Sequence, residues 1–207
     1  MKVTKAQSAD NRQGILDAAA RLYREHGFAG VGVADITRDA GLTHGGLYRH
    51  FESKDALVRE ACAQAFDWSI APLDGLPHAP GDLASRVSAY LSPEHRDRPG
   101  EGCPVAALAV DAARAGADLS AVFAEGVERN VERFARVMGG GLPADEETTP
   151  ALRDAATVTL ATMVGALVLA RATAAGHVGL SDAILATVRD HLLRTAPSSP
   201  PSRIDQR

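Results

Sequence analysis

The chain contains 207 residues, which is the size of one mid-sized domain or two small ones. Hydrophobic residues make up 45% of it and charged residues 23%, a composition typical of a protein that buries a core. No run of about 18 apolar residues predicts a membrane span, and the polar first residues lack the apolar stretch of a secretory signal. We therefore expect a cytoplasmic protein without membrane attachment.

The cysteine and aromatic contents narrow the fold class. Two cysteines, Cys62 and Cys103, are too few for a disulfide framework or a four-ligand zinc site. Aromatic residues make up only 4% of the chain, alternating β-branched runs are scarce and alanine is abundant, which favours helices over sheets. The composition predicts an all-α protein, and we expect no metal and no cofactor.

The net charge of −4 is unevenly distributed along the chain. Residues 1–59 hold nine Lys and Arg against seven Asp and Glu, whereas residues 60–207 hold thirteen Arg against nineteen Asp and Glu. A polyanion would therefore bind the amino-terminal part. A solvated surface with uneven charge gives the same distribution, so both interpretations stay open.

The first predicted elements are short and closely spaced. Residues 1–9 are predicted to be a disordered arm, and Asp10 can cap a first helix that Gly27 ends. A second helix is predicted over 33–40, where Gly41 interrupts it.

The elements that follow begin at capping residues. Thr43 can cap a third short helix, and Ser53 can cap a longer helix that ends near Pro72. Residues 73–80 are rich in proline and glycine and predict a linker. The remaining predicted helices cover 81–91, 103–115, 118–138, 150–175 and 181–195, with loops over 92–102 and 139–149.

The domain organisation follows from these elements. Three short helices with a glycine turn between the second and the third outline a helix-turn-helix, which we expect to form a DNA-binding domain over residues 10–55. Residues 56–196 are predicted to form a helical bundle, which gives about nine helices in total. A disordered tail is predicted over 197–207.

A helix that enters the major groove needs an outer face of small or hydrogen-bonding side chains. The third predicted helix offers this face with Thr43, His44, Gly45, Gly46, Arg49 and His50. Leu47 and Phe51 are four residues apart and are expected to face the core. Tyr48 and Lys54 lie where a hydroxyl and an ammonium can bind phosphates.

This stretch resembles a known family. Its pattern includes Ile15-Leu-Asp-Ala-Ala, Ala40-Gly41-Leu42, Gly46-Leu47-Tyr48, His50-Phe51 and Ser53-Lys54-Asp-Ala-Leu57, and over about residues 11–60 it is similar to the TetR/AcrR transcriptional regulators. The resemblance implies that Thr43, His44, Gly45 and Arg49 face bases and that Tyr48, His50 and Lys54 meet phosphates. One departure is Gly32, where the family often has a capping Ser or Thr.

Each of these residues also has an ordinary structural explanation. Tyr48 can be an aromatic residue at the edge of the core, His44 and His50 can be polar surface residues, and Lys54 can be a solvated lysine in a first helical turn. The two histidines are six residues apart and do not share a helix face, so no metal site is expected.

The resemblance also implies a homodimer with a small-molecule pocket in its larger carboxy-terminal region. Apolar residues in the last two long helices are candidates for the dimer interface, with an intramolecular core as the alternative: Leu160, Val164, Leu167, Val168, Ile184, Val188 and Leu192. Aromatic and sulfur-containing residues are candidates for the pocket, with plain core as the alternative: Phe66, Trp68, Tyr90, Cys103, Phe123, Phe134 and Met163.

Cys103 has two interpretations. It follows Gly102 in the first turn of a predicted helix, where the helix dipole lowers the pKa of a thiol. A Gly-Cys pair here resembles that of electrophile-sensing members of the family, whereas the simpler interpretation is a small buried hydrophobic residue.

The predicted function is that of a ligand-responsive transcriptional regulator. We expect a repressor that binds a palindromic DNA operator as a homodimer and is released by a small molecule. The alternative is a helical small-molecule-binding protein or an enzyme that does not bind DNA. No nucleophile–base motif, phosphate loop or metal-ligand spacing supports an enzyme.

Overall fold

The structure is a computed structural model of the whole chain, and it describes residues 4–74, 82–142 and 146–195. Within these ranges all regular elements are helical, nine α-helices and two short 3₁₀-helices, which confirms the all-α prediction. The elements are α1 (Lys5–His26), α2 (Val33–Asp39), η1 (His44–Arg49), α3 (Lys54–Asp74), α4 (Asp82–Tyr90), α5 (Pro93–Asp97), η2 (Pro99–Glu101), α6 (Pro104–Arg114), α7 (Ala117–Met138), α8 (Pro150–Ala174) and α9 (Val178–Thr195). The predicted tail, the first three residues of the predicted arm and most of the predicted linker lie outside the described residues.

Helix α1 begins earlier than predicted. The Oγ1 atom of Thr4 accepts a hydrogen bond from the backbone N–H of Gln7 at 3.1 Å, so the helix is capped at Thr4 and not at Asp10. The predicted arm was therefore wrong for residues 5–9. At the other end the helix stops at Gly27 as predicted, because this residue adopts a φ of 73° that favours glycine.

The chain forms two compact units, and their division does not follow the predicted boundary at residue 55. The first unit contains residues 1–74 and 98–126, and the second contains residues 75–97 and 127–207. Helix α7 begins in the first unit and ends in the second.

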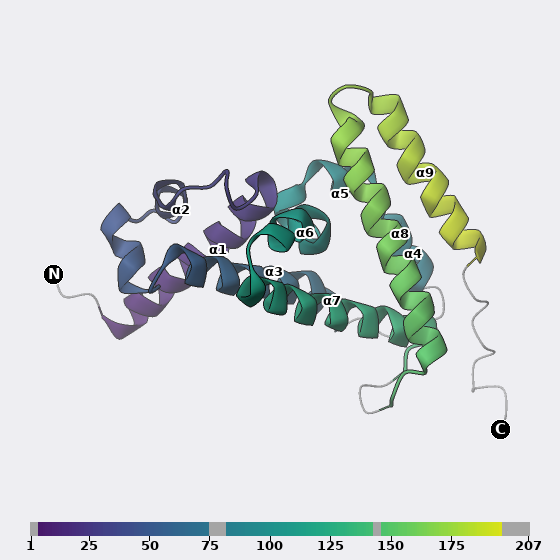
Figure 1. Cartoon of the computed structure of the whole chain (residues 1–207), viewed down its shortest axis with the longest axis horizontal. Helices are drawn as coiled ribbons and strands as arrows, with labels where there is room; N and C mark the ends of the chain where they lie inside the picture. Colours follow the sequence, from purple (N-terminus) through teal and green to yellow (C-terminus); the bar gives the residue numbers. More distant parts are fainter. Residues whose placement is uncertain (1–3, 75–81, 143–145, 196–207) are drawn as a thin grey trace. The chain divides into compact units, whose positions relative to one another are not determined.

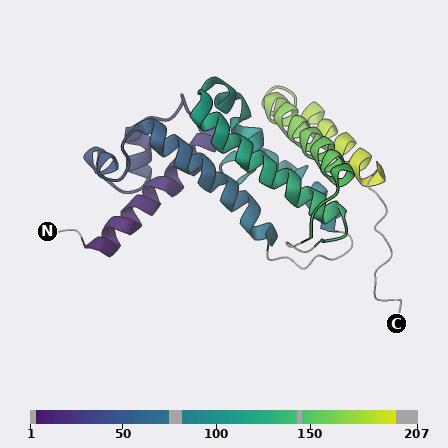
Figure 2. The ribbon, with the colours of Figure 1, turned by 60° about the horizontal axis from the view of Figure 1, so that its bottom comes forward.

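The first unit is built around the packing of α1 on α3, which lie side by side in Figures 1 and 2. Its core includes Ile15, Tyr23 and Leu57, each 0–1% exposed. Helix α7 approaches α3 closely, because a Cβ atom on Gly126 would lie 2.4 Å from the ring of Phe66. Phe123, one turn before Gly126, meets the same ring edge to face at 5.2 Å between centroids.

The second unit is built around the pair α8 and α9, which run side by side in both ribbon views. Helix α4 packs on α9, and α5 packs on α8. The predicted loop over 92–102 was wrong in part, because it contains α5 and η2. Each of these short helices begins at a proline, whose fixed φ suits the first helical position.

Helix α8 is long and apolar enough to cross a membrane by length and composition alone. One of its faces is buried within the second unit through Ala156, Leu160, Met163, Leu167 and Ala170. Burial of one face is typical of a helix that packs against a protein core.

Candidate nucleic-acid interface

Helix α2 and the turn after it carry the first half of the helix-turn-helix. Gly32 is the N-cap of α2 as expected, and without a side-chain oxygen it makes no side-chain cap. Asp35 compensates in part, because its Oδ2 atom accepts the backbone N–H of Gly32 at 3.1 Å. After α2 the chain turns at Gly41, whose φ is 68°, so the turn predicted there is confirmed.

Element η1 takes the place of the predicted third helix, and it is a 3₁₀-helix. Thr43 is its N-cap by backbone conformation but makes no side-chain capping bond, so the predicted hydroxyl cap was wrong. The predicted cap at Ser53 is confirmed, because its Oγ atom accepts the backbone N–H of Ala56 at 3.0 Å. Element η1 is thus held between a glycine turn and a capped helix.

The side chains of η1 divide between core and solvent. Leu47 and Phe51 are 0% and 3% exposed, as predicted for the core-facing positions. Thr43 and Arg49 are exposed, and Tyr48 is 56% exposed. The exposure of Tyr48 argues against its alternative as a core aromatic residue.

Four further candidates are described by the structure to different extents. A Cβ atom on Gly46 would meet no heavy atom within 4 Å, so this residue borders open space. His50 is half-buried at the end of η1. The side chain of His44 and the surroundings of Gly45 lie outside the described part of the structure.

Lys54 differs most from its predicted role. Its Nζ atom donates to the carbonyl oxygen of Val31 at 2.8 Å and to that of Phe28 at 3.3 Å. An ammonium has three N–H donors, so two of them hold the chain between α1 and α2. Lys54 is therefore partly buried and braces the helix-turn-helix from the start of α3.

Arg12 also contributes to this surface, and sequence reasoning did not identify it. Its guanidinium lies 4.6 Å from the centroid of the Phe51 ring, and its Nη2 atom pairs with Glu60 at 2.5 Å. The side chain thereby joins α1, the end of η1 and α3. These partners are 39 and 48 residues away in sequence, so no local spacing indicates them.

The structure distributes the pocket candidates between the two units. Phe66, Trp68, Cys103 and Phe123 belong to the first unit, whereas Tyr90, Phe134 and Met163 belong to the second. Phe66 and Met163 are 1% and 0% exposed, which favours their core alternative.

Each unit has a cleft of its own. Trp68 borders one of about 420 Å³ in the first unit, together with Arg24 and Asp39. A cleft of about 370 Å³ in the second unit is lined by α4, α8 and α9, among others by Leu83, Val158 and Leu192, and by none of the predicted pocket residues.

Cys103 and Arg24 lie in the same buried region of the first unit. Cys103 is 8% exposed, which favours the simpler interpretation as a small buried residue. It is the N-cap of α6, because that helix begins at Pro104, one residue later than predicted. Arg24 is 5% exposed, and burial lowers the pKa of its guanidinium to about 10. Its Nη1 atom donates to the carbonyl oxygen of Gly102 at 2.9 Å.

The dimer candidates need a correction. Leu160 and Leu167 are 5% and 0% exposed and belong to the core of the second unit. Val168 is 39% exposed, and Val164, Ile184, Val188 and Leu192 are partly exposed.

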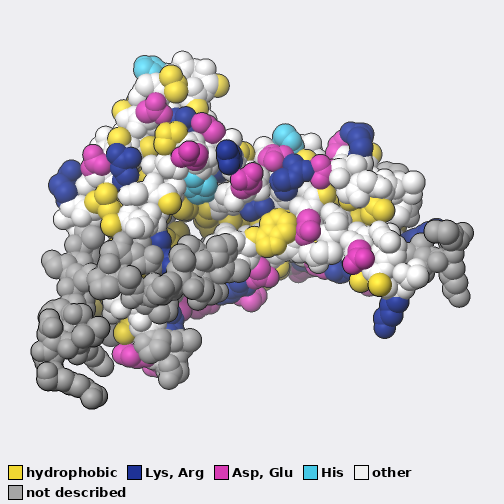
Figure 3. Space-filling model, turned by 180° about the vertical axis from the view of Figure 1, so that it is seen from behind, with side chains coloured by type: hydrophobic (Ala, Val, Ile, Leu, Met, Phe, Trp, Pro, Cys, Tyr) yellow, Lys and Arg dark blue, Asp and Glu magenta, His cyan; other side chains and the backbone are white. Residues whose placement is uncertain are grey.

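The opposite face of α8 is the one that carries exposed apolar residues, and it continues onto the start of α9. We call it the α8–α9 apolar face, and it comprises Val158, Ala161, Gly165, Val168, Leu169, Ala172, Val178 and Leu180. In Figure 3 hydrophobic side chains lie exposed among charged ones on the end of the α8–α9 pair at the upper left. Exposed apolar side chains gathered in this way indicate an interaction surface.

Comparisons with known proteins agree with this geometry. Residues 15–61 match the model of the bacterial regulatory proteins of the tetR family. The repressor KstR2 of Mycolicibacterium smegmatis is 37% identical over 65 residues, which are 31% of this chain and 32% of that protein. The regulator AcrR of Shigella flexneri is 39% identical over 57 residues, which are 28% of this chain and 26% of that protein. The chain thus spans about a third or less of the length of these curated relatives.

Solved structures match over most of the chain. A TetR-family regulator from Cytophaga hutchinsonii has a TM-score of 0.70 at 20% identity, over 94% of this chain and 98% of that one. The reduced form of NemR from E. coli has a TM-score of 0.66 at 18% identity, over 87% of this chain and 96% of that one. The class is thus that of all-helical proteins with an amino-terminal helix-turn-helix. Over residues 15–61 the chain is similar to the tetR family of bacterial regulatory proteins, and over most of its length it has the fold of a solved regulator of that family.

Proposed function

We propose that the chain is a ligand-responsive transcriptional regulator, specifically a repressor, that binds a palindromic DNA operator as a homodimer in the cytoplasm. The observation that carries this proposal is the surface of η1, where Thr43, Tyr48 and Arg49 are exposed while Leu47 and Phe51 hold the element to the core. The alternative, a helical binding protein or enzyme without DNA binding, gives no reason for an exposed tyrosine beside an exposed arginine at this position.

The proposed DNA contacts divide by chemistry. Thr43, His44, Gly45 and Arg49 would face bases, and an arginine can donate two hydrogen bonds to guanine. Tyr48 and His50 would contact phosphates. Lys54 has one N–H left for a phosphate after its two bonds to carbonyl oxygens.

The α8–α9 apolar face supports the homodimer. The small residues Ala161 and Gly165 lie between Val158 and Val168 along α8, which allows a second helix to approach closely. A two-fold axis through this face would pair the helix-turn-helix segments of two copies, as a palindromic operator requires.

The effector is proposed to bind within residues 56–196. The cleft of about 370 Å³ in the second unit falls in the size range of small-molecule sites. The dimer would exist in a DNA-binding form and in a form whose two helix-turn-helix segments are further apart. An effector that binds the second form more tightly would lower operator affinity by the difference in its affinity for the two forms.

The experiment begins with the operator. Purified protein is mixed with sheared DNA of the organism that encodes the chain, and the retained fragments are sequenced. We expect a palindrome whose half-sites lie about one DNA turn apart or a multiple of it, and an affinity that falls steeply with salt. Retention of no fragment would favour the alternative function, and retention of random fragments alone would contradict the proposed operator.

A further inference from the structure

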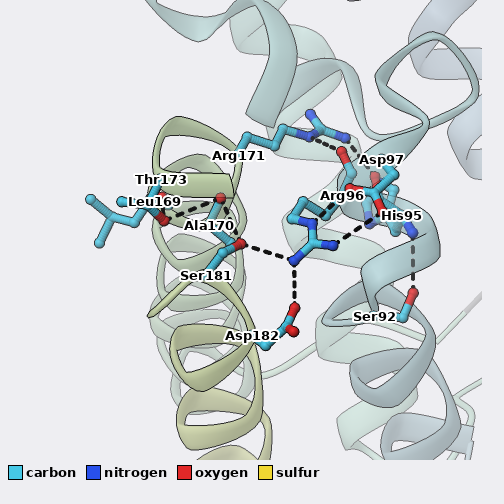
Figure 4. Close-up of polar contacts among 10 residues, drawn as sticks. All are labelled: Ser92, His95, Arg96, Asp97, Leu169, Ala170, Arg171, Thr173, Ser181 and Asp182. Carbon is cyan, nitrogen blue, oxygen red and sulfur yellow. Dashed lines mark hydrogen bonds and ion pairs between the residues drawn. The ribbon is translucent and has the colours of Figure 1, made fainter. Parts of the chain in front are cut away.

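Arg96 forms a buried polar centre in the second unit (Figure 4). Its side chain is 7% exposed, and its Nη1 atom donates to the Oγ atom of Ser181 at 2.9 Å and to Oδ1 of Asp182 at 2.5 Å. Its Nε and Nη2 atoms donate to the two carboxylate oxygens of Asp97 at 2.7 and 3.1 Å. One guanidinium therefore joins α5 to the beginning of α9.

Arg171 on α8 completes the connection from the other helix of the pair. Its Nη2 atom donates to the carbonyl oxygen of His95 at 2.8 Å, and its Nε atom donates to that of Arg96 at 3.1 Å. Ser181 in turn donates to the carbonyl oxygen of Ala170 at 2.8 Å. The end of α8, the beginning of α9 and the short helix α5 are thus tied to one another by side-chain hydrogen bonds.

The residues that make these bonds are neighbours in sequence of residues of the α8–α9 apolar face. Ala170 and Arg171 lie directly after Val168 and Leu169, which are 39% and 57% exposed. Ser181 lies directly after Leu180, which is 45% exposed. The buried side of this helix end therefore fixes the positions from which the exposed apolar side chains project.

The chemistry of the centre indicates that it fixes the position of α9, and that it does more than add stability to the fold. Removing a charged side chain from water is costly, and apolar residues of similar volume often stabilise a fold as well as a buried ion pair does. Hydrogen bonds, however, are directional, and a guanidinium that donates to both a hydroxyl and a carboxylate on α9 accepts few arrangements. A centre of this kind specifies one register of α9 against α8.

We propose that Arg96 is a positioning residue for the dimer surface. By holding Ser181 and Asp182 it sets where Val178 and Leu180 lie relative to Val168 and Leu169, and a second copy of this chain packs against that arrangement. The inference rests on the proposed homodimer.

Two aspartates provide a matched test, because both accept from the same guanidinium. Asp182 links Arg96 to α9, whereas Asp97 is its neighbour on α5 and has no part in the link. Their side chains are similarly exposed, at 53% and 59%. The full-length variants Asp182→Ala and Asp97→Ala are compared with wild type by sedimentation equilibrium over a wide range of concentrations, which gives the dimer dissociation constant.

We expect Asp182→Ala to raise the dimer dissociation constant about tenfold or more and Asp97→Ala to change it by less than about threefold. Arg96→Lys keeps the charge but loses the fork of donors, so it is expected to follow Asp182→Ala. Hydrogen exchange over residues 176–184, measured where each variant is fully dimeric, should rise in Asp182→Ala and not in Asp97→Ala.

The possible outcomes separate the inference from the proposed function. A dimeric wild type with equal constants for both aspartate variants would overturn the positioning role of Arg96. A monomeric wild type at every concentration would overturn the proposed homodimer itself, and the inference with it. Leu180→Ser is the positive control, since it alters the apolar face and leaves every side chain of the Arg96 centre in place.

Discussion

The ammonium of Lys54 donates to the carbonyl oxygen of Val31 at 2.8 Å, which ties the first residue of α3 to the chain just before α2. The carbonyl oxygen of Phe28 accepts a second hydrogen bond from the same Nζ atom, so the lysine holds the start of α3 to the segment between α1 and α2. Under the proposed function it would support the DNA-binding surface through the shape of the domain as well as through its charge.

For this reason Lys54→Met should lower both stability and DNA affinity. The methionine keeps the apolar stem but leaves two carbonyl oxygens without their donor, which is expected to cost about 1–3 kcal/mol of unfolding free energy in urea. Lys5→Met removes a charge from α1 and is the control, with an expected change within about 0.5 kcal/mol. An unchanged unfolding midpoint for Lys54→Met would show that the two bonds contribute nothing.

Arg49→Ala should act on sequence discrimination. The side chain is exposed beside Tyr48, and losing a paired contact to guanine costs about 1–3 kcal/mol at one base position while affinity for random DNA changes little. Fluorescence anisotropy with the operator, with operators mutated at single positions and with random duplexes measures the difference. Arg38→Ala is the control, because Arg38 is an exposed arginine on α2. Equal losses on operator and random DNA would assign Arg49 to phosphates.

Gly126→Ala should destabilise the first unit. The added Cβ atom would lie 2.4 Å from the ring of Phe66, and this contact has to be relieved by moving helix or ring, at a cost of about 1–3 kcal/mol. Gly14→Ala in α1 is the matched control, because its Cβ atom meets nothing within 4 Å. There alanine should stabilise the helix by about 0.5–1 kcal/mol. Unfolding in urea measures both variants, and the expected changes have opposite signs.

Glu132 should make stability depend on pH under acidic conditions. Burial raises the pKa of its carboxyl group, but the hydrogen bond from Thr148 and the charges of Arg136 and Arg153 outweigh burial and hold the pKa below its ordinary value. This stabilisation is complete above the pKa of the unfolded chain and is lost as the pH falls through the lower pKa of the folded state.

The variant Glu132→Gln tests that expectation, because it keeps the shape of the side chain and removes the titration. Its unfolding free energy should fall less than that of wild type as the pH is lowered through the acidic range. Glu128→Gln is the control, because Glu128 is 73% exposed and lies on the same helix. Parallel pH profiles for wild type and Glu132→Gln would contradict the assignment.

Local signals predicted the parts of the fold that depend on local chemistry. Gly27, Gly41 and Ser53 end, turn and cap helices through their own backbone or side chain, and all three were placed correctly from the sequence. The core positions Leu47 and Phe51 followed from their spacing of four residues.

The remaining features depend on contacts between distant residues. Arg96 meets Asp182 across 86 positions, and no periodicity indicates such a pair. Helix α8 is apolar on nearly every side, so hydrophobicity alone did not show that Leu160 and Leu167 face inward while Val158 and Leu169 face outward. Aromatic identity likewise did not show to which unit each pocket candidate belongs.

The open space beside Gly46 bears on which substitutions this position accepts. Since a Cβ atom at this position would meet no heavy atom within 4 Å, a side chain can begin there without disturbing the packing beneath. Under the proposed function, single substitutions there would alter the contacts with DNA while the scaffold that presents them stays unchanged.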